Sequence, residues 1–220
     1  MNFIKLLIFI LIVYIPNLAV AKSAEHMGAG GFTGFNTSTA GNNAIKGYDD
    51  STRLENGFVI GGTFFYAPKN SYGAGVEGLI ETFSMNLSGD ADYGRLTVTP
   101  VMVLFKYQGF PSTKIGFAGH GDIGIGIAFT NFEKGEFFHD LEIERYRVHS
   151  KVETDNTFVF QMGGGVDYFF NRKVSMNLDL KWMYCVVPFK ASVEGYYLDD
   201  MDKINASNLQ LVLGATYWIW

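Results

Sequence analysis

Beyond residue 21, apolar and polar positions alternate along most of the chain, and a period of two is typical of β-strands whose two faces differ. The alternation is clearest over residues 174–186, where even-numbered positions are apolar and odd-numbered positions are mostly polar. Residues 115–129 and 157–170 repeat it. Residues 57–66, 73–85 and 94–107 are apolar on both faces, 28–38 is a weaker first candidate, and 208–220 completes the set. The pattern predicts eight strands and an all-β fold.

The connections between these segments alternate in length. Short turns are expected at residues 67–72, 108–113 and 171–172, whereas the other connections are longer and the longest covers residues 131–156. An even number of strands with short turns at one end and long loops at the other is typical of outer-membrane barrels. Most segments also reach the roughly 9–11 residues that a tilted strand needs to cross a bilayer. We therefore expect an eight-stranded antiparallel transmembrane β-barrel with short periplasmic turns and long external loops.

A secreted, water-soluble barrel is the structural alternative, because alternation alone does not say which face meets water. Four features favour a membrane barrel. Glycines such as Gly163 and Gly165 lie on the polar face, where they suit a narrow interior. Large apolar residues form long rows on the other face, and the sequence closes on an aromatic residue, Trp220. Aromatic residues also gather near strand ends, where a membrane interface would hold them: Tyr66, Tyr72, Tyr107, Phe110, Tyr168, Phe169, Phe170 and Trp218.

Residues 1–21 have the organisation of a secretory signal peptide. A short positive start precedes an unbroken apolar run over residues 6–15, and Ala19-Val20-Ala21 supplies small residues at the expected cleavage site. Pro16 ends the run well short of the roughly 20 residues that a membrane-spanning helix needs. We expect cleavage after Ala21, so that residues 22–220 form the barrel domain in a bacterial outer membrane. Outer-membrane lipids, and the barrel-assembly machinery during insertion, are the partners that this location implies.

Charge and composition narrow the possible functions. The 17 basic and 22 acidic side chains give a net charge of -5, which lacks the cationic surface that nucleic-acid binding requires. Cys185 is the only cysteine, so the chain has no intrachain disulfide and no Cys-rich metal motif. The Gly-x-Ser-x-Gly motif of serine hydrolases is also absent. We expect no enzymatic activity and no cofactor.

Charged and amide residues on the predicted interior face are the candidate lumen residues. They are Glu77, Glu81, His120, Asp122, Gln161, Asp167, Asp179 and Lys181. Glu77 and Glu81 lie four residues apart on one strand, about 13 Å at strand rise, which is too far for direct acid–base pairing. Two interpretations of the set stay open. It forms either a gate or polar plug, or an interior ion network whose charges satisfy one another because unpaired charges in a narrow barrel would be costly.

The longest connection, residues 131–156, is the third of the long loops. It carries a run of charged residues that includes His139 and His149. Such a run is typical of a solvated surface, here one that extends a hairpin outward, since residues 141–152 keep partial alternation. A metal or catalytic site in this loop is the alternative.

Several motifs in order along residues 54–220 resemble the OmpW family of small outer-membrane barrels. They are Thr99-Pro100 before residues 101–107, Gly124-Ile125-Gly126-Ile127-Ala128-Phe129, Gly165-Val166-Asp167-Tyr168-Phe169-Phe170-Asn171, and the closing Gly214-Ala215-Thr216-Tyr217-Trp218-Ile219-Trp220. Barrels of the OmpA, OmpX and opacity type share such glycine-aromatic strands. The chain departs from the family in its first strand, which lacks the usual arginine, in its terminal Trp in place of Phe, and in its charged third loop. The resemblance implies a barrel with a mainly apolar lumen that admits small hydrophobic molecules and releases them sideways into the membrane.

Two functions follow as hypotheses. The first is passive passage of small hydrophobic solutes, which fits apolar residues such as Leu79 and Phe83 on the face of Glu77 and Glu81. Glycines in 124–126 and 163–165 are expected to leave room for it in the wall or bore. The second is a surface structural or adhesive protein whose charged lumen plugs the barrel. The sequence does not predict an oligomeric state.

Overall fold

The computed structural model describes residues 26–39, 52–67, 72–87, 91–111, 115–140, 150–193, 196–197 and 202–219. The predicted signal peptide, residues 1–21, lies outside the described residues, as do residues 141–149 of the third loop.

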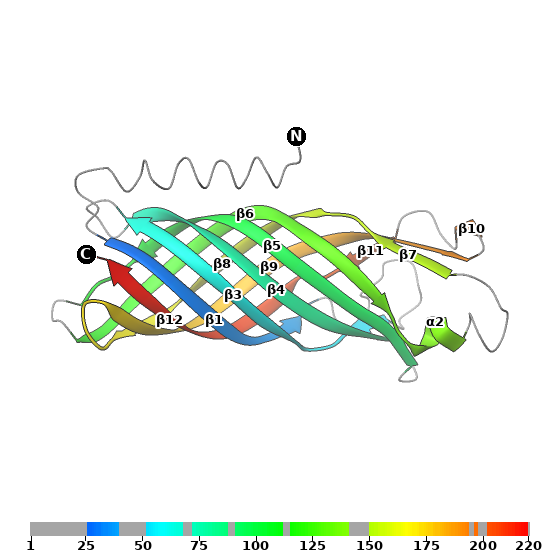
Figure 1. Ribbon diagram of the computed structural model, residues 1–220, viewed down its shortest axis with the longest axis horizontal. Helices are drawn as coiled ribbons and strands as arrows, with labels where there is room; N and C mark the ends of the chain where they lie inside the picture. Colours follow the sequence, from blue (N-terminus) through cyan, green and yellow to red (C-terminus); the bar gives the residue numbers. More distant parts are fainter. Residues whose placement is uncertain are drawn as a thin grey trace.

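Eight long strands close into an antiparallel barrel (Figure 1). They are β1 (His26–Ser38), β3 (Gly57–Ala67), β4 (Tyr72–Leu87), β5 (Ala91–Gln108), β6 (Gly116–Lys134), β8 (Thr157–Phe169), β9 (Val174–Val193) and β12 (Asn208–Ile219). Each of these strands pairs with the next along the chain, and β12 pairs with β1 to close the barrel. The predicted eight-stranded antiparallel barrel is confirmed, including its weak first strand.

The two ends of the barrel differ. β1 begins and β12 ends at the left of Figure 1, where the short connections also lie, and we call this the turn end. There, Asn171 accepts hydrogen bonds at its Oδ1 from the backbone N–H groups of Lys173 and Val174, at 2.7 and 3.0 Å, which stabilises the tight β8–β9 turn. The opposite end, with the longer connections, is the loop end.

In the described part of the chain, the loop end carries one short helix and four short strands. They are α2 (Glu136–Asp140), β2 (Thr52–Leu54), β7 (Ser150–Thr154), β10 (Tyr196–Tyr197) and β11 (Asp202–Asn205). β2 pairs with β4, whereas β7, β10 and β11 all pair with the long end of β9. The expected hairpin extension falls mostly on residues 141–149, which lie outside the described residues; the described end of that segment, β7, pairs with β9.

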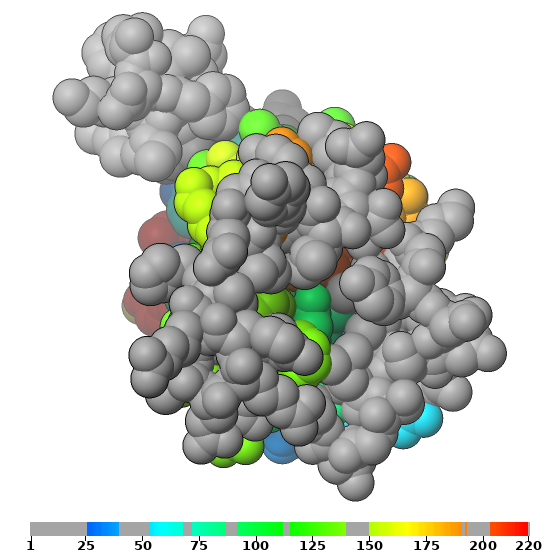
Figure 2. All heavy atoms as spheres, turned by 90° about the vertical axis from the view of Figure 1, so that its right-hand side faces the viewer, coloured from blue at the N-terminus to red at the C-terminus, as the bar shows by residue number. Residues whose placement is uncertain are grey.

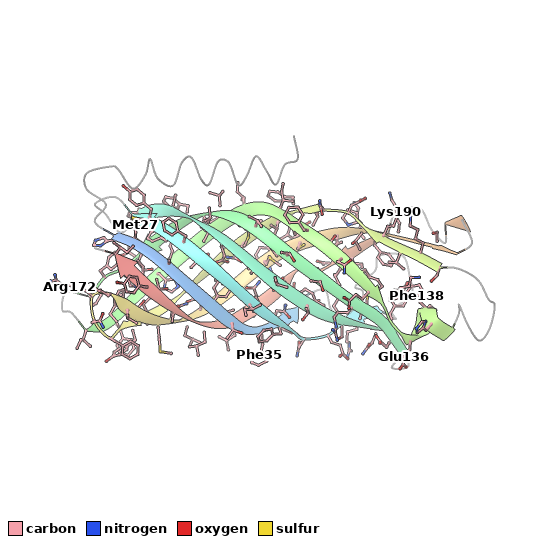
Figure 3. The ribbon with its side chains drawn as sticks, in the orientation of Figure 1. Met27, Phe35, Glu136, Phe138, Arg172 and Lys190 are labelled. Carbon is pink, nitrogen blue, oxygen red and sulfur yellow. The ribbon has the colours of Figure 1, made fainter. Side chains whose placement is uncertain are left out.

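Side chains on the barrel strands alternate between the outer face and the bore. On β9, Leu178 and Leu180 are 54% and 52% exposed, whereas Asp179 between them is 5% exposed. The same outer row runs from Met176 to Val186, which covers about 23 Å of barrel axis at strand rise and a tilt near 45°. The apolar face thus points outward and the polar face inward. Phe35, on β1, shows the outward direction in Figure 3.

The helix in the described part of the chain is too short to cross a membrane.

Aromatic residues near the turn end divide between the two faces. Tyr72 and Tyr107 pack against each other on the outside, with ring centroids 5.0 Å apart. Phe169 and Trp218, which were expected at a membrane interface, are instead buried at 1% exposure inside the bore. Consecutive strand residues face opposite sides, so in Phe169-Phe170 and Tyr217-Trp218 one ring points outward and its neighbour inward.

Candidate functional site: the barrel interior

All eight candidate lumen residues lie inside the bore. None of Glu77, Glu81, His120, Asp122, Gln161, Asp167, Asp179 and Lys181 is more than 8% exposed. They fall into three hydrogen-bonded groups plus Asp122, and together with their amide and hydroxyl partners they form what we call the polar centre.

The first group is built around His120 on β6. Its Nδ1 lies 2.7 Å from Oδ2 of Asp167 on β8, and its Nε2 lies 2.9 Å from Oδ1 of Asp179 on β9. Two carboxylates at these distances favour the charged form of the ring. Asp167 also accepts from Gln108 Nε2 at 2.7 Å and from Ser175 Oγ at 3.2 Å. The group therefore ties four neighbouring strands together across the bore.

The second group joins β4 to β8 and β9. Lys181 Nζ donates to Glu77 Oε2 at 2.7 Å, and Gln161 Nε2 donates to Glu77 Oε1 at 2.8 Å. The Lys181 ammonium also lies 4.4 Å from the centroid of the Phe32 ring, within the range of a cation–π contact. The buried charges of Lys181 and Glu77 are thus paired with each other.

Glu81 belongs to a third group. Its hydrogen-bond partners differ from those of Glu77. Its Oε1 accepts from Gln210 Nε2 at 2.6 Å, and its Oε2 accepts from Asn208 Nδ2 at 3.2 Å. The structure separates the two glutamates into different networks.

Asp122 borders a small cavity of about 20 Å³ within the polar centre, which Lys106, Lys181 and Asp179 also line. Its Oδ1 is buried and has no protein hydrogen-bond partner. The cavity is large enough for one water molecule, since a water needs about 10–15 Å³ of such volume.

Several polar-centre residues were not among the predicted ones. Asn208 and Gln210 alternate with Leu209 and Leu211, and this period of two is the signal that identifies them. Gln108 has no comparable signal, because β5 is apolar on both faces and its inward positions cannot be assigned from the pattern.

Below the polar centre, aromatic rings close the turn end. Phe65, Phe169 and Trp218 pack inside the bore with Phe110, and we call these four residues the turn-end plug. The ring centroids of Phe110 and Trp218 lie 5.4 Å apart, and Trp218 Nε1 donates to Ser175 Oγ at 2.9 Å. The plug is therefore fixed to the polar centre by a hydrogen bond.

Toward the loop end the inward side chains become apolar. We call the following buried set the loop-end core: Val59, Phe83, Met85, Leu96, Val98, Met102, Ala128, Val159, Met183, Cys185, Val187, Phe189, Ile204 and Ala206. Each is 2% exposed or less. The bore thus changes from apolar to polar along its axis.

The glycines that were expected to leave room do not do so. A Cβ on Gly163 would lie 2.8 Å from Lys181 Cγ, one on Gly165 would lie 2.4 Å from Asp179 Oδ1, and one on Gly124 would lie 2.6 Å from Leu104 Cδ2. These positions are glycine because long side chains from neighbouring strands already cross them. The expectation of open space is wrong, since the space is used to seat charged and apolar side chains against the wall.

The outer wall carries two grooves. One, of about 590 Å³, is bordered by Gly121, Leu180 and Trp182 and also reaches Asp122 and Lys181. The other, of about 610 Å³, spans β1 to β6 and reaches Glu77 and Met102, the last a member of the loop-end core, as well as Gly62 and Gly78. We call the second the apolar groove.

The wall beside the apolar groove is irregular. The β4–β5 register runs to Gly78↔Val101 and resumes at Glu81↔Val98, so that Leu79 and Ile80 have no partner in the ladder. The opposing segment contains Pro100, which has no backbone N–H to donate. The β4–β5 backbone ladder is therefore interrupted beside the groove.

Within the described residues, no group of three or more His, Cys, Asp or Glu side chains is arranged to hold a metal ion. The acidic, basic and amide side chains of the polar centre bind one another. Such an arrangement is suited to filling and closing the bore more than to catalysis.

Comparison with known proteins supports the fold. No family model matches the chain, and no curated protein matches it. Among solved structures, the outer membrane protein OprG from Pseudomonas aeruginosa has a TM-score of 0.67 at 15% identity, covering 90% of this chain and 97% of that one. The outer membrane protein AlkL has a TM-score of 0.56 at 12% identity, covering 90% of each chain. The Escherichia coli outer membrane protein W has a TM-score of 0.52 at 16% identity, covering 91% of this chain and 100% of that one. At these identities the likeness concerns the fold, and the chain has the fold of eight-stranded outer-membrane barrels.

Proposed function

We propose that the chain is an outer-membrane barrel that passes small hydrophobic molecules from the loop end into the membrane, without covalent chemistry. The membrane location rests on the outer face, where Phe117 and Phe35 are 73% and 71% exposed beside charged residues that face inward. Such a continuous apolar surface is unfavourable in water. It disfavours the water-soluble barrel, in which the apolar face would point inward.

The observation that carries the transport proposal is the division of the bore. An apolar solute entering from the loop end first meets the apolar side chains of the loop-end core, and the Glu81 group lies beside the deeper ones, at the level of Val59 and Val98. It is then stopped by the polar centre and the turn-end plug. Met102 links the core to the apolar groove, and the ladder beside it is interrupted, so the groove is the exit of lowest cost. The other groove reaches Asp122 and Lys181, and none of the described residues in its lining belongs to the loop-end core.

The test uses purified full-length protein in liposomes and a small apolar fluorescent reporter. Entry of the reporter should be faster than into protein-free liposomes, while ion conductance across a planar bilayer stays at background because the polar centre closes the bore. Reporter entry equal to that of empty liposomes would rule the proposal out.

A surface structural or adhesive role is the second candidate. It is favoured by the close filling of the bore, in which Leu96, Val98 and Met183 are fully buried. This role is supported if cells that lack the protein lose surface attachment while reporter entry is unchanged.

A further inference from the structure

A cluster of five aromatic rings closes the loop-end mouth of the barrel. These rings, which we call the aromatic cap, belong to Tyr93, Phe132, Phe137, Phe138 and Phe189. They come from β5, β6, α2 and β9. Phe189 is also part of the loop-end core, so the cap lies directly on the apolar end of the bore.

Phe138 is the most enclosed ring of the cap that is not on a barrel strand. It is 2% exposed although it belongs to a helix of only five residues. Its centroid lies 4.8 Å from that of Tyr93, 5.5 Å from Phe137 and 6.4 Å from Phe132, all within the range of favourable aromatic pairs. Figure 3 shows Phe138 at the loop end of the barrel, and Figure 2, which faces this end, shows green atoms of the β5-to-α2 part of the chain near the middle of the view.

The two closed ends of the bore differ in how they are held. Three of the four plug rings, Phe65, Phe169 and Trp218, sit on β3, β8 and β12, so they cannot leave without breaking barrel ladders, and only Phe110 lies in a turn. Phe138 sits on a single helical turn, joined to β5 by one backbone bond from Gly135 N to Tyr93 O at 3.0 Å. Helices this short are marginal by themselves. The loop end is therefore the end that can open while the barrel stays intact.

We propose that Phe138 is a movable stopper, and that the aromatic site it fills is the entry site for a small uncharged aromatic ring. This inference rests on the proposed function and names the class of solute that enters first. When α2 moves, Tyr93, Phe132 and Phe189 are left lining a space the size of one ring. Apolar cavities of that size take up benzene-like molecules readily, and an entering ring recovers the edge and face contacts that Phe138 gives up.

Cys185 provides a reporter that requires no added group. It is the only cysteine of the chain, it is fully buried, and it lies in the loop-end core beneath the cap. We would measure its rate of labelling by N-ethylmaleimide in the full chain reconstituted in lipid vesicles. Phe138→Ala should raise the rate at least about tenfold, because the open population rises. Glu136→Ala, in the same helix but exposed and outside the aromatic cap, should change it less than about twofold.

Toluene provides the ligand arm of the experiment. In Phe138→Ala it should slow labelling, since a bound ring replaces the missing one. Equal labelling of Phe138→Ala and the wild type, or equal acceleration by both substitutions, would overturn the stopper, and a lack of toluene protection would overturn the entry site. If Phe138→Ala does not fold, Phe138→Leu keeps an apolar side chain and should give an intermediate rate. Reporter entry into liposomes is scored separately, so accelerated labelling without reporter entry in the wild type refutes transport and leaves the stopper standing.

Discussion

Lys181 shows how a full charge is kept inside the barrel. Its side chain is 3% exposed, and its ammonium is shared between the Glu77 carboxylate and the face of Phe32. Burying an unpaired ion costs several kcal/mol even after relaxation, and an ion pair with additional hydrogen bonds offsets that penalty. Gln161 supplies such a bond to the other oxygen of Glu77.

Removing one charge of the Lys181–Glu77 pair should destabilise the barrel more than removing both charges. Lys181→Leu leaves Glu77 buried beside Gln161 alone and should lower the free energy of unfolding by about 3–5 kcal/mol. Adding Glu77→Gln should recover a large part of that loss. Guanidinium titrations in lipid vesicles measure both. Lys190→Leu is the control, since Lys190 lies 4.0 Å from Asp155 and is about a third exposed, and it should lower stability by less than about 1 kcal/mol. A double variant no more stable than Lys181→Leu would contradict the pairing.

The sequence predicts interior residues well where one face of a strand is clearly apolar. Asp179 and Lys181 follow from the alternation with Leu178 and Leu180, and the structure places them inside. The pattern fails at Trp218, where an aromatic residue suits both the bore and a membrane interface and only its neighbours in space decide. It also fails at Gly163, because nothing in the sequence shows that Lys181 from the next strand crosses that position.

β9 has the clearest separation of an apolar outer face from a polar inner face. Because the strand is long, the apolar outer band can be tested at two positions along the barrel axis. Leu180 lies in the outward row near the middle of the strand, and Ser192 lies on the same face near the loop end. Leu180→Arg should reduce the stability of the barrel in bilayers by about 2–4 kcal/mol, and Ser192→Arg by about 0–1 kcal/mol, because the penalty for a charge facing lipid falls toward the interface. Folding titrations into lipid vesicles compare the two. Similar losses at both positions would be inconsistent with the proposed membrane span.

β12 closes the barrel and also holds the turn-end plug. Trp218→Ala removes a ring packed against Phe110 and Phe169 and leaves Ser175 without its donor, so it should lower the free energy of unfolding by about 3–5 kcal/mol. Tyr217→Ala removes a neighbouring ring that is 51% exposed and should have a clearly smaller effect. Thermal unfolding monitored by electrophoretic mobility distinguishes them. A larger effect at Tyr217 would place the important ring on the outside of the barrel.

At the level of elements, period-two alternation is sufficient for the eight barrel strands but not for the additions at the loop end. β7, β10 and β11 are five residues or shorter and exist because β9 extends beyond the barrel and offers them a partner. Strands this short carry too few residues to show a period, so their pairing is decided by tertiary contacts. The same holds for α2, which follows β6. The pattern expects that strand to stop at residue 129, but it continues to Lys134.

The whole molecule is a bore closed at both ends with a change of polarity between them. The polar centre ties β4, β5, β6, β8, β9 and β12 across the bore, which keeps the barrel rigid and excludes a straight path for ions. An apolar molecule that enters the loop-end core gains nothing by moving toward that centre, where it would displace paired charges. The lipid side of the wall is a better environment for it, so the arrangement of polarity favours the sideways exit that we propose.

The two outer grooves allow the route to be tested without disturbing the bore. A Cβ added at Gly78, in the apolar groove, would have no atom within 4 Å, and one added at Gly121, in the other groove, would lie 3.5 Å from Gly163 O. Both positions face outward, so leucine fits at either without strain in the lumen. Gly78→Leu should slow reporter entry into liposomes several-fold, because its side chain fills the exit beside the interrupted β4–β5 ladder. Gly121→Leu should leave entry close to the wild-type rate, since the described lining of its groove includes no residue of the loop-end core. Slower entry in Gly121→Leu alone would move the exit to the other side of the barrel, and unchanged entry in both variants would show that solutes do not leave through either groove.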